Sequence, residues 1–261
     1  MQSTVRFMLA LLSTSAKASV ALRGAFITQA LFMLANNLVF FVMWWILFQS
    51  VDEISGWRFR DCTAMYAIVA GAIGICQIMG GGLRELARVI ADGDLDSYLA
   101  LPQSTLLQAL ASKSNPSGWG DIMSSFVLLY WAEYFVPGKL ALAAFLMCTG
   151  AVMFLAAGVI IHSTAFWAGP IENLARHAWE FVIAFSLYPV TIHTGFLKVM
   201  MFTLIPAGFI SYFPVELLRD FSVLSFLTVL GATTFYSALA LFVFARGLQQ
   251  YESGNRIMLR T

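Results

Sequence analysis

Three aspartates, Asp92, Asp94 and Asp96, stand within five positions of one another in the stretch IADGDLDSYLALP. Their spacing matches the first three ligand positions of a calcium-binding EF-hand loop. The sixth position of such a loop must be glycine and is Ser97 here, and the twelfth should be glutamate and is Gln103. Because both discriminating positions fail, the stretch does not predict a calcium site.

Acid–base chemistry is a second use for clustered carboxylates, but it needs a partner group in a pocket that excludes water. The stretch contains no histidine or cysteine. Elsewhere the chain has no C-x-x-C pair, no H-E-x-x-H and no G-x-x-x-x-G-K-[ST] phosphate loop. We therefore expect no catalytic residue, no metal site and no cofactor bound by this chain.

A short helix explains the aspartates better. Gly93 is expected to end the preceding helix, Asp94 to act as N-cap, Asp96 to complement the helix dipole and Pro102 to stop the helix. The helix predicted over 95–101 has an apolar face suited to a groove on a soluble partner. That face consists of Leu95, Tyr98 and Leu99. The alternative is a solvated loop that folds back on its own chain.

The whole composition indicates the setting of this helix. Of 261 residues, 60% are hydrophobic and only 11% charged, with a mean hydropathy of +0.80. Soluble domains carry about a quarter charged residues. No polar tract is long enough for a separate soluble domain. The chain is therefore predicted to be an all-α integral membrane protein with one transmembrane domain, 1–261.

Apolar stretches of about 20 residues predict the membrane-spanning helices. We expect six spans, with a pair of half-helices at 194–221 that dips into the membrane within the extracytoplasmic region 190–221. A competing interpretation makes 171–187 an interfacial helix and 190–213 a span. The six predicted spans are 25–49, 62–82, 119–136, 140–167, 172–189 and 222–245.

Six spans place both termini on one side, and lysine and arginine counts predict which side. With cytoplasmic termini, ten of the fifteen basic residues lie inside. An amphipathic interfacial helix is expected over 1–22, and 83–118 becomes the largest cytoplasmic loop. The five basic residues then placed outside are Arg58, Arg60, Lys139, Lys198 and Arg219.

Two polar groups within the predicted spans are candidate functional residues. Glu172, Arg176 and Glu180 share one helix face, where they could gate the cytoplasmic mouth or form an interfacial ion-pair ladder; His177 is expected to point away from that face. Asn36 and Asn37 could hydrogen-bond between helices or line a pathway.

The stretch GGGLRELARVIADGDLDSYLALPQSTLLQALAS resembles the loop after the second span of ABC type-2 permeases, in a prokaryotic branch. Three further stretches agree in order: FW at 166–167, YPVTIHTGFLKVMMFTLIPAGFISYFP at 188–214 and RGLQQYESGNR at 246–256. Together they cover nearly the whole chain, and the last is similar to the C-terminal signature of that branch.

This resemblance implies a half-transporter with six spans, an N-terminal interfacial helix and a re-entrant pair before the last span. Such a chain sits in the cytoplasmic membrane of a prokaryote. It dimerises with itself or a similar permease and docks a separate subunit that holds ATP and magnesium. The residues that the resemblance assigns to the coupling helix are Gly93, Asp94, Leu95, Asp96, Tyr98, Leu99 and Pro102. The family often has a second aromatic or basic residue where Ser97 and Ala100 stand.

The sequence thus leads to one main hypothesis, the permease subunit of an ATP-driven exporter, which itself performs no chemistry. The alternatives are an ion-coupled transporter or membrane enzyme, and a membrane anchor for a soluble complex. The transported compound is unidentified, and the 23 phenylalanines favour an amphipathic or lipophilic one.

Overall fold

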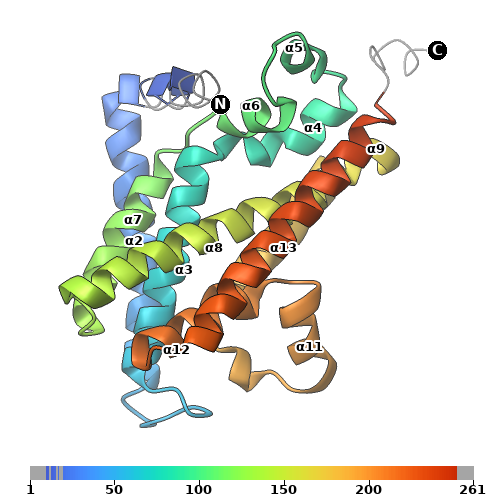
Figure 1. The fold of residues 1–261 in the computed structure, drawn as a ribbon. Coiled ribbons are helices and arrows are strands. Elements are labelled where there is room, and N and C mark those ends of the chain that lie inside the picture. Colours follow the sequence, from blue (N-terminus) through green and yellow to red (C-terminus); the bar gives the residue numbers. More distant parts are fainter. Residues whose placement is uncertain (1–9, 12, 16, 18–19, 252–261) are drawn as a thin grey trace.

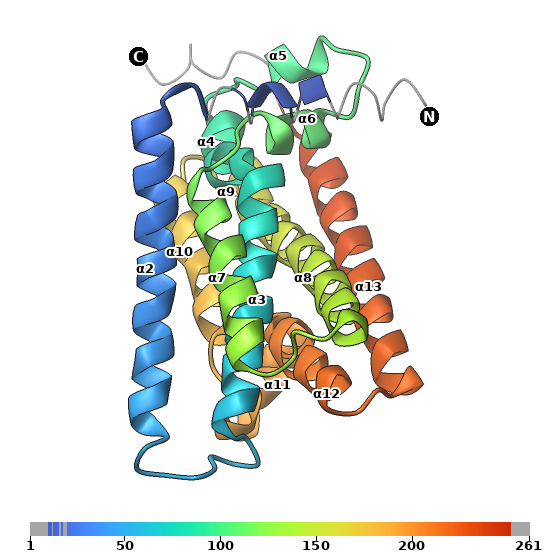
Figure 2. The same ribbon diagram turned by 90° about the vertical axis from the view of Figure 1, so that its left-hand side faces the viewer.

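Long apolar helices build the protein, as Figures 1 and 2 show in two views of the computed structural model. The structure describes residues 10–11, 13–15, 17 and 20–251. The longer helices are α2 (Arg23–Leu47), α3 (Phe59–Met79), α7 (Ser117–Trp131), α8 (Pro137–Ser163), α10 (Glu172–Ser186) and α13 (Val223–Leu248). The shorter elements are η1 (Gly81–Glu85), α4 (Leu86–Ala91), α5 (Asp96–Leu99), α6 (Thr105–Ala111), α9 (Ala165–Ala168), η2 (Val190–Ile192), α11 (Gly195–Thr203), the π-helical turn η3 (Gly208–Tyr212) and α12 (Phe213–Arg219).

Local sequence signals set where several of these helices begin. Asp61, in the first turn of α3, accepts a hydrogen bond from the backbone N–H of Arg58 at 3.0 Å. Pro137 occupies the first turn of α8, where its missing N–H costs nothing. Ser222 caps α13 by accepting from the N–H of Ser225 at 3.4 Å. The boundaries of the apolar helices therefore follow from ordinary capping chemistry.

The bundle is arranged around α3. This helix is buried along most of its length, between α7 on one side and α8 on the other. Helix α2 packs against α7, while α13 crosses α8 on the far side (Figure 2). Helices α2 and α13 expose many large apolar side chains. A hydrophobic exterior around a buried centre is what a membrane solvent requires.

Four helices are long and apolar enough to cross a membrane, or up to five if the bent pair α11–α12 counts as one, among the described residues. Helices α7 and α10 have 15 residues each, which is about 22 Å at the helical rise. That is shorter than a bilayer core of about 30 Å. The predicted six spans are therefore confirmed only in part.

The region before α13 is broken, as the sequence predicted. Residues Gly195–Thr203 and Gly208–Arg219 form two helical pieces bent by 76°, and the break contains Pro206. Both pieces stay near the end of the bundle away from α5 (Figure 1). A bend of this kind is found both in a broken span and in a re-entrant pair, so the competing prediction of a span over 190–213 stays a prediction. Helix α10 runs lengthwise along the bundle beside α8 (Figure 2).

The start of α2, the segment α4–α6 and the end of α13 lie at one end of the bundle (Figures 1 and 2). The predicted interfacial helix 1–22 lies partly outside the described residues; the positions described there are helical, apart from a bend at Leu22. Ser15 fastens that part to the bundle by donating to the carbonyl oxygen of Ala111 at 2.9 Å.

Candidate partner-docking site

The segment between α3 and α7, residues 80–116, forms a cap on one end of the bundle. Gly82 lets η1 approach α6 closely, because a Cβ atom there would lie 1.9 Å from the carbonyl oxygen of Ala109. Real Cβ atoms do not approach an oxygen so closely. Gly82 of η1 therefore allows this segment to fold tightly onto itself.

Gly93 ends α4, as the sequence predicted. Its φ is +78°, a left-handed conformation that glycine adopts without strain. Its N–H bonds to the carbonyl oxygen of Ile90 at 3.3 Å, and the N–H of Asp94 bonds to that of Val89 at 3.0 Å. This pair of bonds is a Schellman motif. The turn carries the chain outward, so that α5 stands farther from the bundle than α4 or α6 (Figure 2).

Helix α5 is shorter than predicted, covering Asp96–Leu99 instead of 95–101. Leu95 occupies the N-cap position and no side chain caps the helix, so the predicted N-cap role of Asp94 is wrong. The carbonyl oxygen of Asp94 instead accepts a hydrogen bond from Ser97 Oγ at 2.8 Å. Asp96 does lie in the first turn, where a carboxylate complements the helix dipole.

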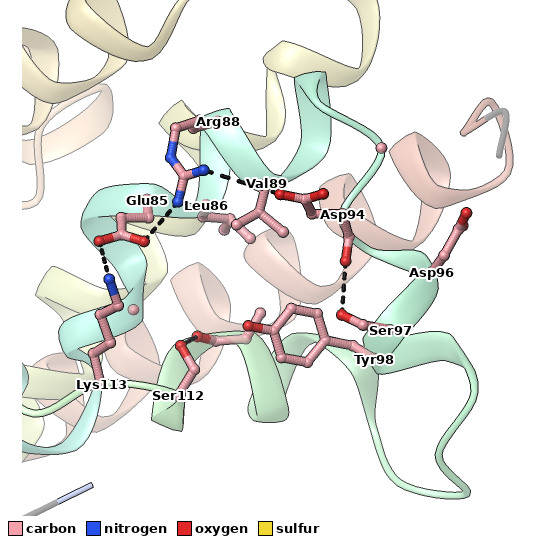
Figure 3. A pocket seen from close by; sticks show the side chains of 13 residues that line it. Glu85, Leu86, Arg88, Val89, Asp94, Asp96, Ser97, Tyr98, Ser112 and Lys113 are labelled. Atoms are coloured by element: carbon pink, nitrogen blue, oxygen red, sulfur yellow. Dashed lines mark hydrogen bonds and ion pairs between the residues drawn. The ribbon is translucent and has the colours of Figure 1, made fainter. Parts of the chain in front are cut away.

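The predicted apolar face of Leu95, Tyr98 and Leu99 is divided. Leu95 is fully buried, and Tyr98 is half-buried with its ring reaching back toward α6 (Figure 3). Leu99 and Leu101 are 45% and 46% exposed. A side chain buried in its own chain cannot also enter a groove on a partner. The prediction that Leu95 faces outward is therefore wrong, and the exposed apolar pair is Leu99 and Leu101.

A charge network holds the base of this site. Arg88 lies 2.8 Å from the Glu85 carboxylate, 3.6 Å from that of Asp92 and 3.9 Å from that of Asp94. Lys113 of the segment after α6 also contacts Glu85 (Figure 3). The hydrogen bond from Lys113, and then those from Arg88, lower the pKa of Glu85. Two of the three aspartates are therefore engaged by a cation of their own chain.

Gln108 holds α5 from another direction, and Tyr251 lies near its first turn. The buried amide of Gln108 donates to the carbonyl oxygens of Tyr98 at 3.2 Å and Gln103 at 3.1 Å. Tyr251, just after α13, packs edge-on against Phe166 of α9. Burial raises the pKa of Tyr251 to about 12, and the nearby Asp96 carboxylate adds to the rise. The protruding helix is therefore tied to α6 by hydrogen bonds and lies close to the end of α13.

Between α5 and the bundle lies a pocket of about 540 Å³. Its wall mixes the charge network with the ring of Tyr98 (Figure 3). Beyond this pocket, α5 exposes a surface of mixed polar and apolar character. The exposed residues there are Asp96, Ser97, Leu99, Ala100, Leu101, Pro102 and Ser104. Helix α5 and the residues after it therefore form a fixed protrusion that a complementary groove on a partner protein could receive.

The predicted charged group on α10 forms different pairs from those expected. Arg176 donates to Asn173 Oδ1 at 3.1 Å, and His177 Nδ1 lies 3.1 Å from Glu180 Oε2. The prediction that His177 points away from Glu180 is therefore wrong. Arg176, His177 and Glu180 are exposed, while Glu172 is half-buried near Arg88, whose pKa it helps to raise.

The two asparagines of α2 have separate surroundings. Asn36 is exposed. Asn37 is buried and donates to Asp121 Oδ1 and Ser124 Oγ, both at 2.8 Å, and accepts from the hydroxyl of Tyr66 at 3.0 Å. Of the two predicted roles, Asn37 fulfils interhelical hydrogen bonding, because it joins α2 to α3 and α7.

Sequence reasoning missed Glu85, Gln108 and Tyr251. The i, i+3 spacing of Glu85 and Arg88 was a usable signal. A lone glutamine inside the apolar run LLQALA was a weaker one. Among the described residues, no three or more histidine, cysteine or acidic side chains are grouped to hold a metal ion.

Comparisons with known proteins bear on what this surface serves. Comparison with curated proteins gave no significant match, and neither did comparison with solved structures. A protein-family model, described as ABC-2 family transporter protein, matches residues 33–254. This match covers the described helices from within α2 to the end of α13, so the chain belongs to the ABC-2 transporter family.

Proposed function

We propose that this chain is the permease subunit of an ATP-driven exporter and that α5 couples it to a separate ATP-binding subunit. The observation that carries the proposal is the exposure of Leu99, at the end of α5, and of Leu101 just after it, on a protrusion whose base is fixed by its own chain. Exposed apolar side chains on a rigid protrusion suit a hydrophobic groove on a partner. ATP and magnesium belong to that partner in this proposal.

Movement of α5 has a physical route into the bundle. The guanidinium carbon of Arg84, in η1, lies 5.8 Å from the ring centre of Trp179 on α10. Trp179 also donates from its indole nitrogen to the carbonyl oxygen of Phe154 in α8 at 3.2 Å. A displacement of the 80–116 segment would therefore reach α10 and α8 through contacts between rigid elements.

Helix α10 indicates where a second permease belongs. Its exposed face carries Arg176, His177 and Glu180. Ionisable groups within a membrane almost always face a protein interior or a water-filled cavity. We propose that α7 and α10 complete six crossings and that a second permease, identical or similar, encloses a polar path against this face. Glu172, Arg176 and Glu180 then line its cytoplasmic mouth.

The proposed orientation places α5 and the termini in the cytoplasm of a prokaryotic cell. It rests on the distribution of lysine and arginine, ten against five in favour of that side. The proposed ATP-binding subunits would then dock from the cytoplasm, the compartment that contains ATP. Transport would proceed outward, toward the end of the bundle that carries α12.

The test is the double variant Leu99→Asp/Leu101→Asp, with Ser104→Asp as the matched control. Ser104 is exposed in the same segment, so its variant adds the same kind of charge without removing an apolar contact. Mildly solubilised wild-type protein should bring down a P-loop ATPase and a permease partner. The double variant should lose at least about tenfold of the ATPase while keeping the permease, and Ser104→Asp should keep both.

Two results would overturn the proposal. One is a wild-type preparation from the native membrane that contains no P-loop ATPase. The other is a double variant that captures the ATPase as well as wild type does. If the chain is monomeric in every preparation, the proposed pairing with a second permease is wrong.

A further inference from the structure

At the end of the bundle away from α5, four segments enclose a hollow of about 420 Å³. They are the α2–α3 connection with the first turn of α3, the end of the α7–α8 connection, the first turn of α8 and the end of α12. The lining residues are Glu53, Gly56, Arg58, Arg60, Asp61, Tyr134, Lys139 and Arg219. Four of the five basic residues that the sequence places at this end therefore converge on one hollow.

Two of these cations are held mainly by carbonyl oxygens and an aromatic ring; Lys139 has no carboxylate within ion-pair distance among the described residues, and Arg60 has only that of exposed Glu133. Arg60 Nε donates to the carbonyl oxygen of Ala132 at 2.9 Å, and its guanidinium carbon lies 4.4 Å from the ring centre of Tyr134. Lys139 Nζ donates to the carbonyl oxygen of Leu218 at 3.0 Å and lies 4.8 Å from the same ring centre. A ring face and carbonyl oxygens orient a cation but leave its charge unneutralised.

The acids at the hollow do not balance its cations. Asp61 is held by Arg219 through two bonds, at 2.7 and 2.6 Å, so this pair neutralises itself. Glu53 lies 3.8 Å from exposed Arg58. The carboxylate of Glu133 lies 3.5 Å from Arg60 and is 77% exposed, which weakens its effect through solvent screening. The hollow therefore keeps an excess of positive charge around Arg60 and Lys139.

A second hollow, apolar and of about 490 Å³, is lined by residues that neighbour Tyr134 of the basic hollow in the sequence. Phe135 and Val136 in its wall are 50% and 53% exposed, and they follow directly after Tyr134 of the basic hollow. Tyr130 and Trp131 complete the wall, with Glu133 at its edge. Aromatic side chains of this kind mark the level of lipid headgroups. The residues of the basic hollow are thus followed directly by an exposed apolar surface, the combination expected where a protein meets lipid headgroups and acyl chains.

We propose that the two hollows form one binding site for an anionic phospholipid of the leaflet at this end of the bundle. Its phosphate would lie between Arg60 and Lys139, and an acyl chain would follow Phe135 and Val136. Basic pockets between helices are suited to charged headgroups. The adjoining apolar wall favours a lipid over a small soluble anion, because only a lipid can fill both hollows.

The test uses the purified full chain in nanodiscs of phosphatidylcholine with increasing phosphatidylglycerol, read by thermal unfolding. Phosphatidylglycerol should raise the Tm of wild type in a saturable way. Arg60→Gln/Lys139→Gln should weaken the apparent affinity by about thirtyfold, from ~1 kcal/mol for each cation. Lys198→Gln is the matched control, because exposed Lys198 lies on α11 outside both hollows. It should respond as wild type does.

Several outcomes would overturn the proposal: no shift of the wild-type Tm, an unchanged response of the double variant, or an equal loss in Lys198→Gln. A Tm shift produced equally by inorganic phosphate in phosphatidylcholine nanodiscs would assign the basic hollow to a small anion and overturn the lipid assignment. If the double variant does not fold, Lys139→Gln alone should show about a fivefold loss, and a wild-type response there would overturn it too.

Discussion

The two ends of the bundle arrange their charges in opposite ways. Near α5, Arg88 is surrounded by the carboxylates of Glu85, Asp92 and Asp94. At the other end, the carboxylate of Asp61 is bound by Arg219 and lines a hollow with three further cations. The same residue types thus produce an acidic, leucine-bearing protrusion at one end and a basic hollow beside an apolar wall at the other. We propose different partners for the two surfaces, a soluble ATP-binding subunit and an anionic lipid.

The two ends also differ in the sequence separation between the residues that their hydrogen bonds join. The contacts of Gln108 with Tyr98 and Gln103 span 10 and 5 residues. The Arg219–Asp61 bond joins positions 158 residues apart. Loss of a contact near α5 should therefore loosen one segment, while loss of the Asp61 contact should loosen several elements together.

The largest expected effect is a difference in the free energy of unfolding between alanine variants of two leucines in the same short segment. Leu95→Ala should lower the free energy of unfolding by about 3 kcal/mol, because Leu95 is fully buried and its truncation leaves a cavity. Leu99→Ala should change it by less than about 0.5 kcal/mol, because Leu99 is 45% exposed. Denaturant titration of the solubilised chain measures both. Hydrogen exchange should place the loss from Leu95→Ala within residues 80–116, and equal effects of the two substitutions would contradict the burial assignment.

The next effect concerns the opposite end. Asp61→Asn should cost about 2 kcal/mol, because it leaves Arg219 without its bidentate partner. Arg219 is one-third exposed, so the loss is smaller than for a fully buried pair. Limited proteolysis should show increased cleavage in both the 48–58 connection and the segment around α12. Increased cleavage in only one of them would contradict the long-range character of this end.

Local chemistry made much of the fold predictable. The apolar runs predicted α2, α3, α8 and α13 because a membrane-spanning helix needs about 20 apolar residues. Gly93 was predictable as a helix end because only a residue tolerant of positive φ closes a Schellman turn easily. Pro206 and its neighbours similarly indicated a break, which the 76° bend confirms.

What the sequence could not provide was the direction in which short elements face. A 3.6-residue period places Leu95 and Leu99 on one side of a helix, but it does not say which part of a four-residue helix meets its own chain. Packing against the bundle decided that question for Leu95. The basic hollow was hidden for a related reason, since Arg60, Lys139 and Arg219 converge only after distant segments have packed.

The smallest expected effect tests whether the charge network near α5 stabilises the folded chain at neutral pH. The pKa of Glu85 is lowered by Lys113 and then by Arg88, so the ionised form is favoured in the folded state. Its stabilisation is therefore fully present above the unfolded value of 4.5 and is lost as the pH falls through the lower folded value. Glu85→Gln should cost about 0.5–1 kcal/mol at pH 7, discounted for solvent screening. The difference between wild type and variant in denaturant titrations should shrink toward zero as the pH falls through the lowered folded pKa of Glu85. A difference that grows with acidification would mean that the pKa of Glu85 is raised in the folded chain. Glu85 would then not contribute the negative charge that distinguishes the end near α5 from the opposite end.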